Sequence, residues 1–183
     1  MGTTDLEAFL GFVRPYREGR DAAHDIHHVE RIIRRLDTLS EGITPPPRRR
    51  LLHFLACFHG LGTRVHEDAA LTDQVRSLLS ACGWNGTEID EALECLERHL
   101  RAPQTVEEDI VHDANYVELL GAFGIAKAFL TGGSRGQSLQ ETVQIYEEGY
   151  LDQVSFRTPV GRRLAQEGRE YAKRFLARLR QEW

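Results

Sequence analysis

The sequence is poor in cysteine and has no long apolar run. Its three cysteines, Cys57, Cys82 and Cys95, form no Cys-x-x-Cys pair. An odd number without that spacing argues against a disulfide framework and against a thiolate zinc site. No window approaches the ~18 consecutive apolar residues of a membrane-spanning helix. The N-terminus also lacks the basic start and apolar run of a secretory signal. We therefore expect a cytoplasmic protein with no membrane partner.

An excess of positive charge is also missing. The chain has 23 Lys and Arg against 28 Asp and Glu, a net charge of -5. Without a basic field, a nucleic-acid polymer is not an expected partner. The hydrophobic fraction of 41% and the charged fraction of 28% are ordinary for a globular domain. The length of 183 residues suits one domain, which we assign to residues 1–183.

Strand-like alternation is absent as well, whereas apolar residues recur at helical spacing almost throughout. Val29, Ile32 and Leu36 form the clearest apolar stripe. A Thr-x-x-Asp pattern at Thr87 and Asp90 predicts the start of a further helix. The expected helices cover about residues 6–13, 29–39, 51–58, 68–81, 87–100 and 106–130, with two more in segments 137–151 and 158–179. The expected fold class is all-α.

Three metal-capable side chains fall on the inward faces of three separate helices. His28 borders the apolar stripe, His59 follows Leu55 by four residues, and Asp113 follows Ile110 by three. A buried carboxylate is costly unless it is paired or bound to a metal, so Asp113 is the most informative of the three. The spacing leaves two interpretations open: satisfied core histidines with a hydrogen-bonded aspartate, or a metal site.

Three segments carry a resemblance to a known family. AHDIHHVERI (residues 23–32) resembles the H-D-x-x-H-x-x-R-V opening of small single-domain HD-superfamily phosphohydrolases. IVHDANYVELLGAFGIAKAF (residues 110–129) is similar to that family's V-x-D-A-D-x-L-x-A-x-G-x-I-G-I-A-R-A-F segment, and TPVGRRLAQEGREYAKRFLARLRQEW resembles its closing helix. The resemblance implies an HD-domain helical bundle, with a core over about residues 23–130 and a helical cap formed by the two ends.

The resemblance also implies a metal site. The family's ligands are one His, an adjacent His-Asp doublet and a distant Asp, and these fall on His28, His59 and Asp113. Gly60 replaces the aspartate of the doublet, and Asn115 replaces the second acid of D-A-D. The implied reaction is metal-dependent hydrolysis of a small phosphorylated, nucleotide-type substrate. A divalent Mn, Mg, Ni, Co or Fe ion would supply a metal-bound water as nucleophile.

Further residues match positions around the family's metal. His99 corresponds to a pocket histidine that would contact phosphate or act as a general acid. Asp25 would orient a ligand histidine, so His99 and Asp25 are the candidate catalytic residues. A surface histidine and a helix N-terminal acid are the alternatives. Arg31 and Lys127 would either contact phosphate or pair with an acid.

The missing aspartate leaves three functional hypotheses. In the first, the site still hydrolyses a phosphoester or pyrophosphate, with a replacement ligand from His66, Glu67 or Asp68. In the second, a degenerate HD domain with little or no catalysis binds a ligand or a protein partner. In the third, the three predicted metal ligands form a non-haem iron oxygenase-like site, since two histidines and one carboxylate suit Fe(II).

Overall fold

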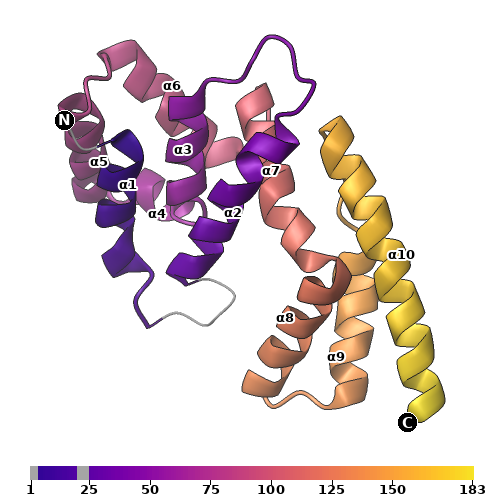
Figure 1. Ribbon diagram of the computed structural model, residues 1–183. Coiled ribbons are helices and arrows are strands. Elements are labelled where there is room, and N and C mark those ends of the chain that lie inside the picture. The colour runs from indigo at the N-terminus through magenta and orange to yellow at the C-terminus, as the bar shows by residue number, and fades with distance from the viewer. Residues whose placement is uncertain (1–3, 20–24) are drawn as a thin grey trace.

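Ten α-helices build the described part of the chain, residues 4–19 and 25–183, in the computed structural model (Figure 1). They are α1 (Asp5–Val13), α2 (Ile26–Leu39), α3 (Arg49–Phe58), α4 (Gly62–Glu67), α5 (Ala69–Ala81), α6 (Gly86–Arg98), α7 (Val106–Tyr116), α8 (Gly121–Ser134), α9 (Leu139–Tyr146) and α10 (Pro159–Glu182). Short 3-10 turns follow α1 (η1, Arg14–Tyr16) and α7 (η2, Val117–Leu119), and a π-helical turn follows α9 (η3, Glu147–Leu151). Over these residues there is no β-strand, and the all-α prediction is confirmed. None of these helices has both the length and the apolarity needed to cross a bilayer.

The helices form two groups, which Figure 1 shows side by side. Helices α1–α7 enclose the larger apolar core, in which Phe9 meets Phe54 and Phe58 edge-on. Helices α8, α9 and α10 enclose a smaller core, which contains Tyr146 and Leu176. The long helix α10 contacts α2 and α7 as well as α8. It therefore ties the two groups together.

The helix expected over residues 106–130 is interrupted, so that prediction is wrong. Leu120 is extended, and Gly121 has a φ of +67°, a left-handed conformation that glycine adopts at no steric cost. Gly124 then lies close against the preceding turn, because a Cβ there would come within 2.2 Å of the Leu119 carbonyl. The break redirects the chain from the larger group into the smaller one. It creates the corner at which the pocket described below lies.

Two further differences concern helix starts in the larger group. Helix α6 begins with a capping box between Asn85 and Glu88, so the start predicted at Thr87 and Asp90 lies two residues too late. Helix α4, which the apolar spacing did not predict, occupies the segment between α3 and α5. It is one and a half turns long and buries only Val65, which leaves little periodic signal.

Candidate functional site

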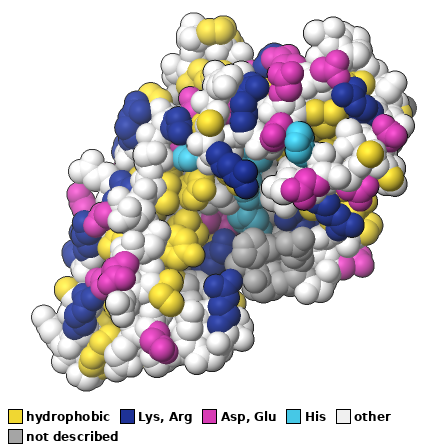
Figure 2. All heavy atoms as spheres, turned by 180° about the vertical axis from the view of Figure 1, so that it is seen from behind, with side chains coloured by type: hydrophobic (Ala, Val, Ile, Leu, Met, Phe, Trp, Pro, Cys, Tyr) yellow, Lys and Arg dark blue, Asp and Glu magenta, His cyan; other side chains and the backbone are white. Residues whose placement is uncertain are grey.

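A pocket of about 360 Å³ lies between the two groups of helices. Its walls come from α2, α7, α8, α9 and the turn after α3. Its basic side chains are those of His28, His59, Lys127 and Arg135. No Asp or Glu is among the described residues that line it. Histidine and basic side chains gather at this junction in the space-filling view (Figure 2).

His28 lies in the first turn of α2, where Asp25 is the N-cap. The Asp25 carboxylate accepts a hydrogen bond from the His28 backbone N–H at 3.0 Å. Asp25 therefore fixes the backbone of His28. The imidazole ring of His28 has another partner. The ring's Nδ1 lies 2.9 Å from Oε2 of Glu118, which is fully buried. His24, the neighbouring histidine of the opening motif, lies outside the described residues.

His59 and His99 form a directed chain of hydrogen bonds. Nδ1 of His99 lies 2.8 Å from the Leu96 carbonyl, which can only accept, so this nitrogen carries the proton. Nε2 of His99 therefore accepts from Nδ1 of His59, at 3.3 Å. His59 keeps a lone pair on Nε2. By the same reasoning Nδ1 of His28 donates to the Glu118 carboxylate.

The three histidines are electrically neutral at neutral pH. Burial lowers the pKa of His28 despite the neighbouring Glu118 carboxylate. Burial, together with repulsion from His99, holds the pKa of His59 well below its usual value. Burial also lowers the pKa of His99 to about 4. The rings of His28 and His59 lie 5.4 Å apart between centroids. The pocket is thus lined by two neutral imidazoles.

Asp113 does not join these histidines. It is 0% exposed, and one oxygen accepts hydrogen bonds from the backbone N–H and the hydroxyl of Thr158, both at 2.8 Å. The other oxygen accepts a hydrogen bond from the Arg157 backbone N–H at 3.1 Å and lies 3.0 Å from Nδ1 of His112. The carboxylate thus anchors the N-terminus of α10. The structure brings together two residues of the predicted metal set, and the third acts elsewhere.

The D-A-N segment of α7 faces the pocket through its last residue. Asn115 lines the pocket, whereas Asp113 does not. Two residues along a helix turn the side chain by about 200°, so only one of the two motif acids can point to a given cavity. The acid position that reaches the pocket is therefore the one that asparagine occupies. With Gly60 beside it, the histidine side of the pocket presents no carboxylate among the described lining residues.

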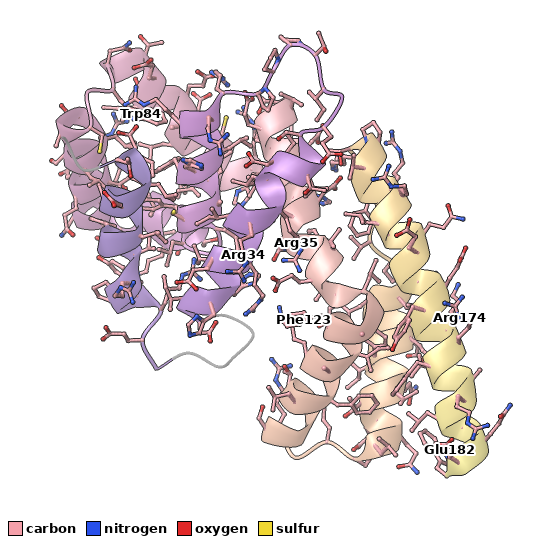
Figure 3. The ribbon with its side chains drawn as sticks, in the orientation of Figure 1. Arg34, Arg35, Trp84, Phe123, Arg174 and Glu182 are labelled. Atoms are coloured by element: carbon pink, nitrogen blue, oxygen red, sulfur yellow. The ribbon has the colours of Figure 1, made fainter. Side chains whose placement is uncertain are left out.

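Glu118 is the centre of a buried charge cluster. The sequence does not single out this acid, but pairing with an acid is one of the two roles expected for Arg31 and Lys127, and both pair with Glu118. Its carboxylate lies 2.8 Å from Nε of Arg31, 2.7 Å from Nη1 of Arg35 and 3.5 Å from Nζ of Lys127. Burial alone would raise the pKa of Glu118, but the hydrogen bonds from His28 and Arg31 and the nearby cations hold it at about 2. Figure 3 shows Arg35 and Phe123 on either side of this junction between α2 and α8. Of the three cations that contact Glu118 among the described residues, Lys127 lines the pocket.

The replacement ligands predicted after Gly60 lie away from the pocket. His66 is exposed and pairs with Glu97 at 3.6 Å. Asp68 caps α5 by accepting a hydrogen bond from the Leu71 N–H. Glu67 is exposed at the end of α4, and none of the three lines the pocket.

Comparison with known proteins supplies the fold. The sequence matches no protein-family model and no curated protein. A crystal structure of Bacillus subtilis YpgQ in complex with ADP superposes with a TM-score of 0.79 at 20% identity, over 98% of this chain and 95% of that one. An HD-superfamily hydrolase from Bacillus thuringiensis superposes with a TM-score of 0.77 at 22% identity, over 97% and 96%. The chain has the HD-superfamily fold.

A third structure of this fold agrees. It is a predicted HD-superfamily hydrolase from an uncultured Thermotogales bacterium, with a TM-score of 0.69 at 21% identity over 98% and 94% of the two chains. All three likenesses span nearly the whole chain, so the HD-superfamily fold includes α8, α9 and α10 as well as the larger group.

Within this HD-superfamily fold, the described residues do not fit a divalent metal. No group of three His, Cys, Asp or Glu side chains in residues 4–19 and 25–183 converges closely enough to hold one. The pocket offers the imidazoles of His28 and His59 and the amide of Asn115, and no carboxylate to compensate the charge. Hard divalent ions such as Mg²⁺ and Mn²⁺ prefer carboxylate and water ligands. The two-histidine, one-carboxylate set of an iron oxygenase is not assembled either, because Asp113 anchors α10.

Proposed function

We propose that this chain binds a small phosphorylated molecule of the nucleotide type in the pocket, through its own cations. The observation that carries the proposal is the charge of the lining: Lys127 and Arg135 face the pocket, and no carboxylate does so among the described lining residues. Asn115 and the two neutral histidines add hydrogen-bonding groups. Positive and uncharged polar groups without an acid favour a phosphate over a metal ion.

The rest of the pocket suits an apolar ring. Leu119, Ile145, Tyr146 and Tyr150 line it on the side of α8 and α9. The hydroxyl of Tyr146 donates to the Leu119 carbonyl at 2.9 Å, which fixes its ring in place. A ligand with an anionic end and a flat apolar end would match both parts. The ADP bound to YpgQ, a protein of the same fold, has this character.

Metal-dependent hydrolysis is the second candidate, and one observation favours it. The rings of His28 and His59 lie 5.4 Å apart between centroids, and both residues line the pocket. Two imidazoles are a partial ligand set for the divalent ion of a phosphohydrolase. We therefore rank ligand binding with little or no catalysis first.

The test is calorimetric titration of the metal-free protein, in EDTA, with ADP, AMP, pyrophosphate and adenosine. We expect ADP to bind more tightly than adenosine. Lys127→Met should weaken ADP about tenfold, the loss of one charge-assisted contact. The control Arg101→Met, on an exposed arginine outside the pocket, should leave the affinity unchanged. Absence of binding by all four compounds would refute the proposal. Near-stoichiometric metal in protein purified without added metal would favour the second candidate.

A further inference from the structure

The pocket extends beyond its histidines along a groove between α8 and α9. These helices run antiparallel and side by side, joined by residues 135–138 (Figure 1). Three residues spaced four apart line the pocket along this groove: Lys127 and Thr131 of α8, and Arg135 at its C-cap. Because a helix rises ~1.5 Å per residue, Lys127 and Arg135 lie about 12 Å apart along its axis. The pocket therefore carries cations at two places, two helical turns apart.

The two cations differ in their partners. Lys127 lies at the histidine end, where its Nζ pairs with the Glu118 carboxylate at 3.5 Å. Among the described residues, the exposed side chain of Arg135 forms no hydrogen bond and no ion pair. The nearest acid along the chain, Glu141, accepts hydrogen bonds from the backbone N–H and the hydroxyl of Ser138 instead. The charge of Arg135 is thus open to a ligand.

The backbone fixes the place from which Arg135 leaves the helix. Gly136 has a φ of +72°, and the Gln137 N–H beyond it donates to the Gly132 carbonyl at 3.0 Å. This pattern is the Schellman motif, which closes a helix C-terminus. Gly132 in turn packs against Thr142 of α9, because a Cβ on this glycine would overlap the threonine hydroxyl. Both contacts hold the end of α8 against α9.

The groove between the two cations is mainly apolar. Because α9 runs antiparallel from the contact of Gly132 with Thr142, Ile145 and Tyr146 lie beside the middle of α8, where Ala128 also lines the pocket. Ile145 is 44% exposed although it belongs to the pocket lining, so a ligand has access to this stretch. An apolar middle with a cation on either side matches a ligand that carries an anionic group at each end.

We propose that the pocket takes a ligand with an anionic group at each end, and that Arg135 binds the distal one. The first anionic group is the phosphoryl group at the histidine end, so the inference rests on the proposed function. The second is a phosphate or a carboxylate beyond the flat ring, about two helical turns away. The phosphates of ADP lie next to each other at one end, so ADP fills only the part near Lys127. Arg135 therefore selects the ligand by its length and its charge.

The first experiment titrates the metal-free protein, in EDTA, with octane bisphosphonate, which carries a phosphonate at each end of an apolar chain. Octylphosphonate has only one anionic end, and in propane bisphosphonate the two ends are too close together to reach both cations. We expect octane bisphosphonate to bind about tenfold more tightly than either of these probes, because it makes one further charge-assisted contact. An affinity no higher than that of octylphosphonate would overturn the inference.

Variants of Arg135 test whether this residue supplies the gain. Arg135→Gln should lower the affinity for octane bisphosphonate to that for octylphosphonate, whose own affinity should stay unchanged because the histidine end is intact. Arg135→Lys keeps the charge and should stay within about threefold of the unmodified chain. The control Arg101→Gln, on an exposed arginine outside the pocket, should change neither affinity. If Arg135 served only the helix dipole, the gain would survive Arg135→Gln, and that result would overturn the inference.

The second experiment uses nucleotides, which have a flat ring in place of the alkane chain. Succinyl-AMP carries two carboxylates on its base, and AMP is the same nucleotide without them. We expect succinyl-AMP to bind about tenfold more tightly than AMP, and Arg135→Gln to abolish the difference. If ADP and AMP bind but the succinyl group adds no affinity, the inference fails and the proposed function stands. If ADP, AMP and pyrophosphate all fail to bind, the proposed function fails, and the bisphosphonate comparison still decides the role of Arg135.

Discussion

Asp113→Asn separates a structural aspartate from a metal ligand. The carboxylate is fully buried and accepts hydrogen bonds from Thr158, Arg157 and His112. An asparagine of the same shape keeps one accepting oxygen and turns an NH₂ group toward donors. At least two hydrogen bonds are lost. Each bond to a charged group contributes about 1.5–3 kcal/mol, so we expect a loss of about 3–5 kcal/mol in the free energy of unfolding.

The assay is urea unfolding at pH 7.5 in EDTA, followed by circular dichroism. With a slope of about 2 kcal/mol per molar urea, the midpoint should fall by about 1.5–2.5 M. The matched control is Asp109→Asn on the same helix. Asp109 is 35% exposed, and its one ion pair, to Arg157, is 3.8 Å long. Its replacement should change the stability by less than about 0.5 kcal/mol.

The chelator makes the result decisive. A metal ligand contributes nothing to the stability of a metal-free protein, whereas an anchor of α10 contributes in full. A loss below about 1 kcal/mol for Asp113→Asn in EDTA would refute the anchoring role, since even one lost charge-assisted bond exceeds it. It would return Asp113 to the metal site that the sequence predicts.

Three further predictions concern the buried charges and the helix break. Because burial lowers the pKa of His99 to about 4, against about 6.5 when unfolded, its contribution to stability is complete above pH 6.5 and lost as the pH falls toward 4. Between pH 6.5 and pH 4, each buried histidine of this kind should lower the free energy of unfolding in EDTA by about 1.4 kcal/mol per pH unit. His99→Gln should therefore make the dependence of the free energy of unfolding on pH less steep, and an unchanged dependence would contradict this. Glu118→Gln removes the carboxylate that Arg31, Arg35 and Lys127 share, and it should lower the free energy of unfolding by about 3–5 kcal/mol. If thermal unfolding shows a loss under about 1 kcal/mol, the ion pairs do not form. Gly124→Ala forces a Cβ into the Leu119 carbonyl and should destabilise by about 1–3 kcal/mol. Gly133→Ala, with open space in the same helix, should be neutral or stabilise by up to about 1 kcal/mol, and equal effects would contradict the packing argument.

Helical periodicity predicts most of this fold because the larger core is built from one-sided apolar stripes. Val29, Ile32 and Leu36 of α2 are all buried as the spacing requires. The same spacing fails at residues 117–121, because apolar residues continue in phase through the break. What ends the helix is local: an extended Leu120 and a left-handed Gly121. A glycine in an apolar run has several structural roles, and the sequence does not distinguish them.

The sequence predicts the candidate site in part: it brings the two histidines together but does not separate Asp113 from Asn115. His28 stands at the start of the apolar stripe of α2 and His59 at the end of the stripe of α3. These two helix ends meet, and the two rings lie together. Asp113 and Asn115 are harder to distinguish, because α7 is buried over most of its circumference. His112, Asp113 and Ala114 are consecutive and all buried. Periodicity marks a buried face only where another face is exposed, so it does not show which residue of D-A-N meets the pocket.

The substitutions at the pocket become consistent when they are considered as a change of charge. Gly60 and Asn115 stand at positions where the resembling motif has acids, whereas Lys127 keeps the positive charge of its position. If the resemblance holds, a site with two fewer carboxylates would compensate a dication less well, and its cations would favour the anion that we propose. The buried Glu118 pairs with Arg31, Arg35 and Lys127, of which Lys127 lines the pocket.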